Sequence, residues 1–314
     1  MACAGKRSRI KNLLVKQQAA SVWDAPAGVN NYRLDSGFQA QATPEQIERD
    51  ILKSSYTPEA NLAGILVANM TGVSEMFGAD YSDGTTKPWF NDLFNASQLV
   101  ETKIEEIPVS AIAVDFVYGE IVSGATGVGR VVVPTQSTDT SIIVEVTTGG
   151  FGAENITGSI AGDATATGVE VDRGWSYKFD TSQCVRLSAQ AEEDGQISQI
   201  YNAVPTMSIT AEAGQIPKIN YELSGVIRSV GDVAQWMRDG SMTDLTGLRS
   251  EVVPPKYTSA RLKLDDGTTE WSPVIDSTTT VDTQIERNLR VDANNELGAE
   301  GYVLTGRNPV SNIR

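Results

Sequence analysis

The chain contains no histidine and only two cysteines, Cys3 and Cys184, among its 314 residues. Histidine is the side chain whose ordinary pKa lets it exchange protons near neutral pH. Its absence excludes Ser-His-Asp and Cys-His nucleophile systems, and two cysteines are too few for the usual zinc sites. Two cysteines without a disulfide framework predict free thiols and a reducing compartment during folding. The composition leaves carboxylate chemistry, or no chemistry at all.

Long hydrophobic runs are also absent. No apolar run approaches the roughly 20 residues that a membrane helix requires. The basic N-terminal stretch carries only residues 13–15 as an apolar run, which is too short for a secretory signal. We therefore predict no membrane segment.

Acidic residues outnumber basic ones, since 25 Lys and Arg against 40 Asp and Glu give a net charge of −15. Residues 109–171 hold seven acids and one base, Arg130, which is a local charge of −6. An acidic body repels nucleic acid, because binding normally requires Lys and Arg to neutralise phosphates. The basic residues of the N-terminal stretch, which contains no acid over residues 1–16, are Lys6, Arg7, Arg9, Lys11 and Lys16. We interpret residues 1–20 as a basic arm that contacts a protein partner; a nucleic-acid arm or a solvated tail are the alternatives.

The composition otherwise favours a globular β-protein. Hydrophobic residues make up 40% of the chain, and its many Val and Thr residues favour strands. One convincing helix is predicted from Pro88 to Val100, where apolar residues recur at spacings of three and four. We interpret its Trp and Phe residues as core. A helical turn at 44–46, a short helix at 232–238 and an extended, loop-like end over 303–314 are also expected.

A weak internal repeat distinguishes residues 109–171 from their surroundings. The sequence GEIVSG at 119–124 is echoed by AENITG at 153–158. Each copy follows a strand-like run and precedes a turn of small residues, and an alternating strand at 141–147 lies between them. We predict a small all-β module over 109–171, inserted into a larger domain.

Several motifs have a structural explanation beside a chemical one. The sequence GATGVGRV at 124–131 lacks the Lys and the Ser or Thr of a phosphate-binding loop, so we predict a β-turn. Adjacent carboxylates at 105–106, 192–193 and 265–266 could support glycoside hydrolysis, but 40 acids produce such neighbours by chance. Asp194-Gly195 and Asp266-Gly267 predict hairpin turns. We predict no catalytic, metal-binding or cofactor-binding residue, and a protein that is not an enzyme.

The order of features resembles that of the major tail tube proteins of long-tailed bacteriophages. A basic segment leads to a first strand region, then to ERDIL at 48–52 and to the helix ending near residue 99. The block AGQIPKINYELSG at 213–225, preceded by PTMSI at 205–209, is similar to the family's paired strands. The sequence AEGYVLTGRNP at 299–309 is similar to its closing strand and loop. The resemblance covers about residues 10–108 and 172–314.

The resemblance implies a mainly β fold, with a tail-tube-like β-sandwich or barrel and one flanking α-helix over residues 21–108 and 172–314. Within the inserted module, residues 119–171 resemble a Gly-Glu-x-Val-x-Gly repeat of other phage virion proteins. Six copies would close a ring whose inner strands form a continuous β-barrel, and rings would stack into a hollow tube. The implied partners are further copies of the chain and the tape-measure, tail terminator and baseplate or tail-tip proteins. DNA would pass through the lumen without specific binding. The implied location is the virion tail, after assembly in the host cytoplasm.

Charge leads to two hypotheses within this interpretation. Lumenal Asp and Glu side chains would repel DNA phosphates during ejection. The basic arm, with all five of its Lys and Arg residues, would contact the acidic body of a neighbouring subunit or ring. The alternatives are another virion or surface protein, such as a tail-fibre, baseplate or carbohydrate-binding adhesin component, and a histidine-free carboxylate hydrolase.

Overall fold

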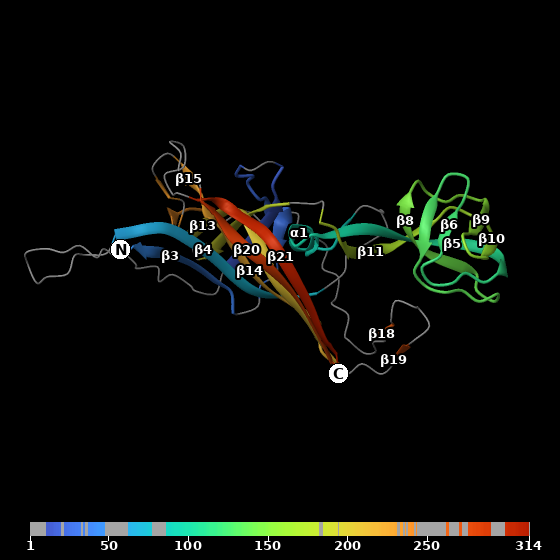
Figure 1. Ribbon diagram of the computed structural model, residues 1–314. Coiled ribbons are helices and arrows are strands. Elements are labelled where there is room, and N and C mark those ends of the chain that lie inside the picture. The colour runs from blue at the N-terminus through green and yellow to red at the C-terminus, as the bar shows by residue number, and fades with distance from the viewer. Residues whose placement is uncertain are drawn as a thin grey trace, which may run out of the picture. The chain divides into compact units, whose positions relative to one another are not determined.

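A computed structural model of the chain is mainly β and divides into two compact units (Figure 1). It describes residues 11–19, 22–32, 34, 37–47, 62–76, 86–181, 185–193, 195–230, 233–234, 236, 238–241, 243, 262–263, 270–271, 276–289 and 299–313. Unit 1 is built from Met1–Met76, Cys184–Lys256 and Asp276–Ile313, and unit 2 from Phe77–Gln183 and Tyr257–Ile275 with Arg314. Both cysteines, predicted to be free thiols, lie outside the described residues.

Unit 1 is a large antiparallel sheet with two small additions. Its elements are β1 (Lys11–Gln17), the 3-10 helix η1 (Gly28–Asn30), β2 (Asn31–Tyr32), β3 (Gln39–Ile47), β4 (Leu62–Glu75), β12 (Leu187–Glu193), β13 (Gln196–Glu212), β14 (Lys218–Ile227), β15 (Ser229–Val230), β16 (Val233–Ala234), β17 (Arg238–Asp239), β20 (Asp276–Leu289) and β21 (Ala299–Ile313).

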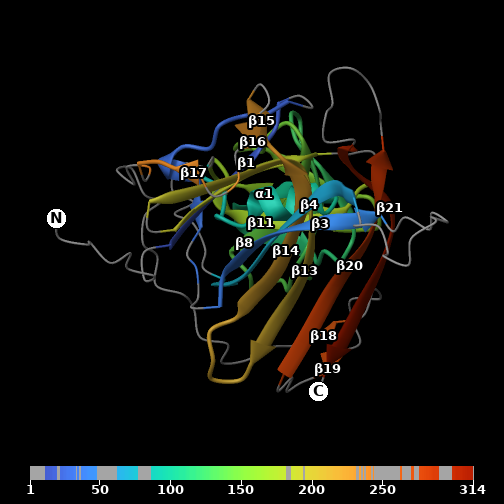
Figure 2. The same cartoon turned by 90° about the vertical axis from the view of Figure 1, so that its left-hand side faces the viewer.

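The long strand β13 organises this sheet (Figure 2). The main path runs β2-β1-β12-β13-β14-β4-β3, and β20 pairs with the later part of β13 and carries β21 on its other side. β12 and β13 form the hairpin predicted at Asp194-Gly195, and Gly195 has the positive φ of 83° that such a turn requires.

Part of the predicted arm belongs to this sheet. Residues 11–17 form β1, which pairs with β12 along its whole length. Leu13, Leu14 and Val15 are fully buried, so the short apolar run of the arm contributes to the core of unit 1.

Three local expectations in unit 1 were wrong. Residues 303–313, expected to be extended and loop-like, belong to the strand β21, because pairing with β20 satisfies their backbone. Residues 44–46 lie within β3, where an irregularity at Pro44 replaces the expected helical turn, as is usual for proline in an edge strand. β16 and β17 occupy described parts of the expected helix at 232–238.

Unit 2 contains the α-helix and a closed β-barrel. Its elements are α1 (Asn91–Ala96), β5 (Leu99–Val114), β6 (Ile121–Ser123), β7 (Val128–Val131), β8 (Ser141–Thr148), β9 (Asn155–Gly158), β10 (Asp163–Ala166), β11 (Val171–Phe179), β18 (Leu262–Lys263) and β19 (Glu270–Trp271). Six strands follow one another in the order β10-β9-β6-β7-β8-β5, and a β10–β5 pairing closes the ring. β11 pairs with the first part of β5, and β18 pairs with β19 as the predicted second hairpin.

The barrel has internal pseudo-two-fold symmetry, which explains the sequence repeat. One half is β5-β6-β7 and the other is β8-β9-β10; β5 pairs with β8, β6 with β9, and the β7–β8 pairing matches β10–β5. Residues 124–127 form the predicted turn, and strand β7, not a helix, follows them. β5 enters the barrel before residue 109, because residues 104–108 pair with β8.

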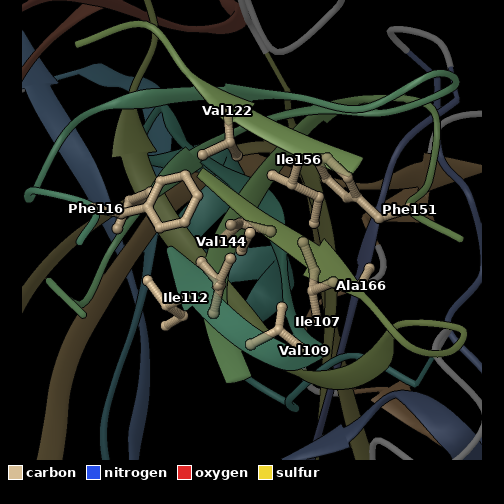
Figure 3. Close-up of a cluster of buried hydrophobic side chains, with 12 residues drawn as sticks. Ile107, Val109, Ile112, Phe116, Val122, Val144, Phe151, Ile156 and Ala166 are labelled. Carbon is tan, nitrogen blue, oxygen red and sulfur yellow. The ribbon is translucent and has the colours of Figure 1, made fainter. Parts of the chain in front are cut away.

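The barrel core reflects the same symmetry (Figure 3). Phe116 and Phe151 lie on opposite sides of a cluster that includes Val122, Val144 and Ile156, and all five are at most 1% exposed. Burying an aliphatic or aromatic side chain of this size contributes about 1.5–3 kcal/mol. The apolar alternation of the strands therefore accounts for the stability of the barrel.

The predicted helix is much shorter than expected. α1 covers only residues 91–96, because the chain turns at Gln98, whose φ is +62°, and β5 begins at Leu99. Its aromatic residues are core as predicted: the rings of Phe90 and Phe94 lie 4.7 Å apart, and Phe94 meets Tyr177 of β11 edge-on at 4.8 Å.

Candidate functional site

The predicted contact residues of the arm are only partly placed. Lys6, Arg7 and Arg9 lie outside the described residues, and Lys11 begins β1. Lys16 makes an ion pair with Asp24 of its own unit, with a distance of 2.7 Å between Nζ and Oδ1. Both side chains are partly exposed, so the pair contributes at most about 1 kcal/mol. Lys16 thus has a partner within the chain.

One face of the large sheet of unit 1 carries mainly polar side chains that are at least partly exposed. We call it the polar sheet face. Alternate residues of six neighbouring strands make it up, because successive side chains of a strand lie on opposite faces. Its described members are Gln39, Gln41, Thr43, Asn69, Thr71, Val73, Glu75, Thr206, Ser208, Thr210, Glu212, Lys218, Asn220, Glu222, Thr278, Thr280, Gln284, Glu286, Asn308, Val310 and Asn312.

The opposite face of the central strands β4, β13 and β14 is largely buried. Met207, Tyr221 and Leu223 are at most 4% exposed, and Tyr221 lies directly over Gly72 of β4. A Cβ at residue 72 would come within 2.6 Å of the tyrosine oxygen, so the sequence needs glycine there. Burial raises the pKa of Tyr221, and a contact of 3.4 Å with the Ser74 hydroxyl only partly opposes this shift. Burial of this face fixes which residues pair across neighbouring strands, and the polar sheet face is the surface that the sheet leaves exposed.

The polar sheet face is weakly acidic and has little positive charge. Four acids and one base among its described members, Glu75, Glu212, Glu222, Glu286 and Lys218, give 1 − 4 = −3. Lys218 lies opposite Glu75 in the register of β14 and β4. A shallow depression of about 400 Å³ lies over these strands, and its lining includes Thr71, Ser208 and Asn220 beside apolar groups. The surface offers hydrogen bonds without a cluster of cations.

Two long strands lie at the borders of this face. β21, with 15 residues, pairs with β20, and β3, with 9 residues, pairs with β4; among the described strands neither has a second neighbour. The order β21-β20-β13-β14-β4-β3 contains five antiparallel pairings. β21 and β3 therefore run in opposite directions. Unpaired edges of this length are templates for pairing with another chain.

The acidic pair Glu105-Glu106, considered for hydrolysis, is split by the pleat of β5. Glu105 is 2% exposed and bonds Lys103, whose Nζ also lies 2.5 Å from an oxygen of Asp172. Burial, opposed in part by Lys103, raises the pKa of Glu105. Glu106 bonds Arg173 and Ser141, and these contacts lower its pKa despite some burial. The neighbouring carboxylates thus belong to separate ion pairs.

The second pair is divided in a similar way. Glu192 is fully buried in unit 1, and its oxygens accept hydrogen bonds from Asn12, Gln190 and Thr243. Gln190 accepts in turn from Gln199, and Gln199 from Arg228 at 2.8 Å. Glu193 is half-buried and occupies the next position along β12. The third pair, at 265–266, lies outside the described residues.

The strand-end glutamates of the barrel repeat form a reciprocal arrangement that the sequence did not reveal. The Glu120 carboxylate accepts the backbone N–H groups of Val117, Ile160, Ala161 and Gly162 at 2.9–3.0 Å. Burial acts to raise the pKa of Glu120, but these four hydrogen bonds together lower it.

Glu154, the equivalent residue of the other copy, accepts the N–H groups of Ala125 and Gly152. Each glutamate therefore holds the turn that follows the other copy. Each also packs on the glycine that ends that copy, Glu120 on Gly158 and Glu154 on Gly124. The shared pattern Glu-x-Val/Ile-Ser/Thr-Gly was the available signal.

Among the described residues, no group of three His, Cys, Asp or Glu side chains is arranged to hold a metal ion. Within the same residues, no helix is long and apolar enough to cross a membrane. No protein-family model matches the chain, and no curated protein sequence matches it.

Proposed function

We propose that this protein is a structural subunit of a phage tail tube, in which six copies form a ring and stacked rings form the channel for DNA. The observation that carries the proposal is the polar sheet face, a six-stranded antiparallel surface bordered by two long strands that have no second neighbour among the described strands. The mainly β architecture agrees with a tail-tube-like fold. In this proposal α1 is the flanking helix and the barrel is an inserted module.

The direction of the two edge strands supports ring closure. Copies related by rotation about one axis all have the same orientation to that axis, so β21 of one copy would run antiparallel to β3 of the next. An antiparallel joint continues the alternation inside each subunit. Six copies of six strands at about 4.8 Å spacing give a circumference of about 170 Å and a diameter of about 55 Å, before strand tilt widens it.

The chemistry of the polar sheet face supports passage of a polyanion. DNA carries a negative charge about every 1.7 Å of its axis, and Lys and Arg clusters retain it. The described side chains of this face carry a net charge of −3, and Lys218 lies opposite Glu75. If this face lines the lumen, phosphates meet hydroxyls, amides and a few carboxylates. They would slide past with little attraction.

The remaining features of the proposal come from the resemblance to tail tube proteins. The subunit would assemble in the host cytoplasm around a tape-measure protein and remain in the virion tail. Tail terminator and baseplate or tail-tip proteins would contact the tube ends. The basic arm with Lys6, Arg7, Arg9, Lys11 and Lys16 would contribute to contacts between copies.

Negative-stain electron microscopy of the purified protein tests this proposal. We expect hollow rings or tubes of uniform width with six-fold symmetry. The double variant Val310→Lys/Asn312→Lys places two charges on the exposed edge strand β21. It should abolish the rings and tubes, because edge charges block strand pairing. The matched control Gln136→Lys/Thr138→Lys adds the same charge at exposed positions of unit 2 and should still assemble.

Two results would count against the proposal. A wild-type protein that stays monomeric at high concentration would contradict ring formation. A trimeric protein that binds glycans would instead favour the adhesin alternative.

A further inference from the structure

The barrel of unit 2 has one exposed apolar corner, formed by Val114, Val117, Ile121 and Ile160. Their exposed fractions are 45%, 45%, 42% and 70%. Single exposed apolar residues are common, but four at one place are not. We call this group the apolar corner.

Hydrogen bonds hold the apolar corner together. The Glu120 carboxylate accepts the N–H of Val117 at 3.0 Å and that of Ile160 at 2.9 Å. Ile121 exchanges two hydrogen bonds with Ser159, the neighbour of Ile160. Val114 lies opposite Asp163 in the β5–β10 pairing. These contacts place the four exposed residues at the same end of the barrel.

Two acids border the apolar corner. Asp115 follows Val114 in the chain, and Asp163 lies beside Val114 across the strand pair. Both are exposed, and neither makes an ion pair with another described residue. The surface is thus apolar in the middle and negative at its border.

The pseudo-symmetry shows that the barrel does not need these side chains. The two halves are aligned by Phe116 with Phe151, Glu120 with Glu154, and the first residues of β10 and β7. In the other half of the barrel, the positions equivalent to Val114, Val117, Ile121 and Ile160 are occupied, in that order, by Gly149, Gly152, Asn155 and Thr126. The positions equivalent to the acids Asp115 and Asp163 are occupied by Gly150 and Val128. The same turn forms there with glycine and polar residues, so the turn itself does not require apolar side chains at these positions.

We propose that the apolar corner binds residues 1–10 of another copy of this chain. The proposal rests on the proposed function, in which many copies lie next to one another. Residues 1–10, MACAGKRSRI, carry Lys6, Arg7 and Arg9, no acid, and apolar residues on both sides of the basic run. A basic run flanked by apolar residues complements an apolar surface with an acidic border. A segment of ten residues reaches at most about 33–36 Å, which suits a contact between neighbours.

The contact should be weak alone and effective in an assembly. Its area is far below the roughly 800 Å² per partner of a stable interface. Several such contacts in one ring act together, and linkage raises their combined affinity well above that of each. Removing both acids should weaken one contact about threefold to tenfold, as expected for exposed ion pairs.

A peptide with the sequence of residues 1–11 tests the contact by fluorescence anisotropy. The acceptor is the full chain with Lys6→Ala, Arg7→Ala and Arg9→Ala, so that its own arm does not compete. We expect saturable binding that weakens with salt and at least about threefold weaker binding to acceptors that also carry Ile160→Thr or Asp115→Asn/Asp163→Asn. The variant Asp139→Asn/Glu170→Gln removes the same charge elsewhere on unit 2 and should bind normally. Thermal unfolding confirms that each acceptor is folded.

Mixing two full-length variants shows whether the contact joins different copies. The acceptor with the altered arm and a donor carrying Ile160→Thr/Asp115→Asn/Asp163→Asn should associate with each other more than either does with itself. Absence of saturable peptide binding, or equal loss in the Asp139→Asn/Glu170→Gln control, would overturn the proposal. Wild-type tubes without peptide binding would refute this contact alone, whereas peptide binding without tubes would refute the proposed function alone.

Discussion

The reciprocal glutamates of the barrel allow a prediction with a control built into the fold. Replacing Glu120 with alanine leaves four backbone N–H groups without their acceptor. Glu120 is 2% exposed, and its bonds are charge-assisted, so each is worth about 1.5–3 kcal/mol in a buried setting. Water will replace part of this around Ile160 and Ala161, which are exposed. We expect Glu120→Ala to lower the free energy of local unfolding of the turn at 159–162 by about 3–5 kcal/mol.

Glu154→Ala is the matched change in the other half of the barrel. Glu154 is half-exposed and accepts only two N–H groups, one of them at 3.3 Å. Loss of the Glu154 carboxylate should lower the free energy of local unfolding of the turn that it holds by about 1 kcal/mol, because water can reach the same amides. The two substitutions have the same chemistry and equivalent positions, and differ in burial and in the number of donors.

Hydrogen exchange of the full-length protein, followed by mass spectrometry or NMR, measures the difference locally. In Glu120→Ala the protection of residues 160–162 should fall at least about a hundredfold, since 1.4 kcal/mol corresponds to a factor of ten. In Glu154→Ala, protection of residue 125 should fall about fivefold. Unchanged protection at 160–162, or an equal loss in both variants, would refute our account of these carboxylates.

Further predictions follow from other observations. Because the pKa of Glu120 is lowered in the fold, the stability that its carboxylate contributes is fully present above the ordinary value of 4.5 and is lost as pH falls through the lower folded pKa. The hydrogen-exchange protection of residues 160–162 should therefore fall in that acid range, and Glu120→Gln should remove this pH dependence. Ile142→Ala, in the barrel core, should lower the free energy of unfolding by about 2–5 kcal/mol, measured by thermal unfolding. Ser110→Ala, at an exposed position, should change the same free energy by less than about 0.5 kcal/mol. Arg228 lies 4.8 Å from the ring of Trp23 and bonds Gln199, so Arg228→Lys should destabilise unit 1 by about 1–2 kcal/mol, visible as a shift in chemical denaturation followed by tryptophan fluorescence. Assembled tubes carrying Glu222→Lys/Glu286→Lys should retain duplex DNA at low salt, unlike wild-type tubes, and equal retention would contradict a lumenal position of the polar sheet face.

Local sequence patterns predicted the features that depend on neighbouring residues. Strand alternation indicated a mainly β fold, and Asp194-Gly195 placed the β12–β13 hairpin. The repeat around Glu120 and Glu154 indicated two related β-units. The aromatic residues near α1 were correctly interpreted as core. Each depends on turn chemistry or on a side-chain period that can be read within about ten residues.

The sequence by itself therefore determined the β class, the turns and the location of the repeat. Only the tertiary structure decided that residues 303–313 form a strand, that six strands of unit 2 close into a barrel, and that the free edges of the unit 1 sheet run in opposite directions. It also decided that Glu120 is buried beneath a turn 40 residues away. These features depend on pairing between segments far apart in the chain. A polar strand such as β21 has no local signal, because its neighbour, and not its own side chains, satisfies its backbone.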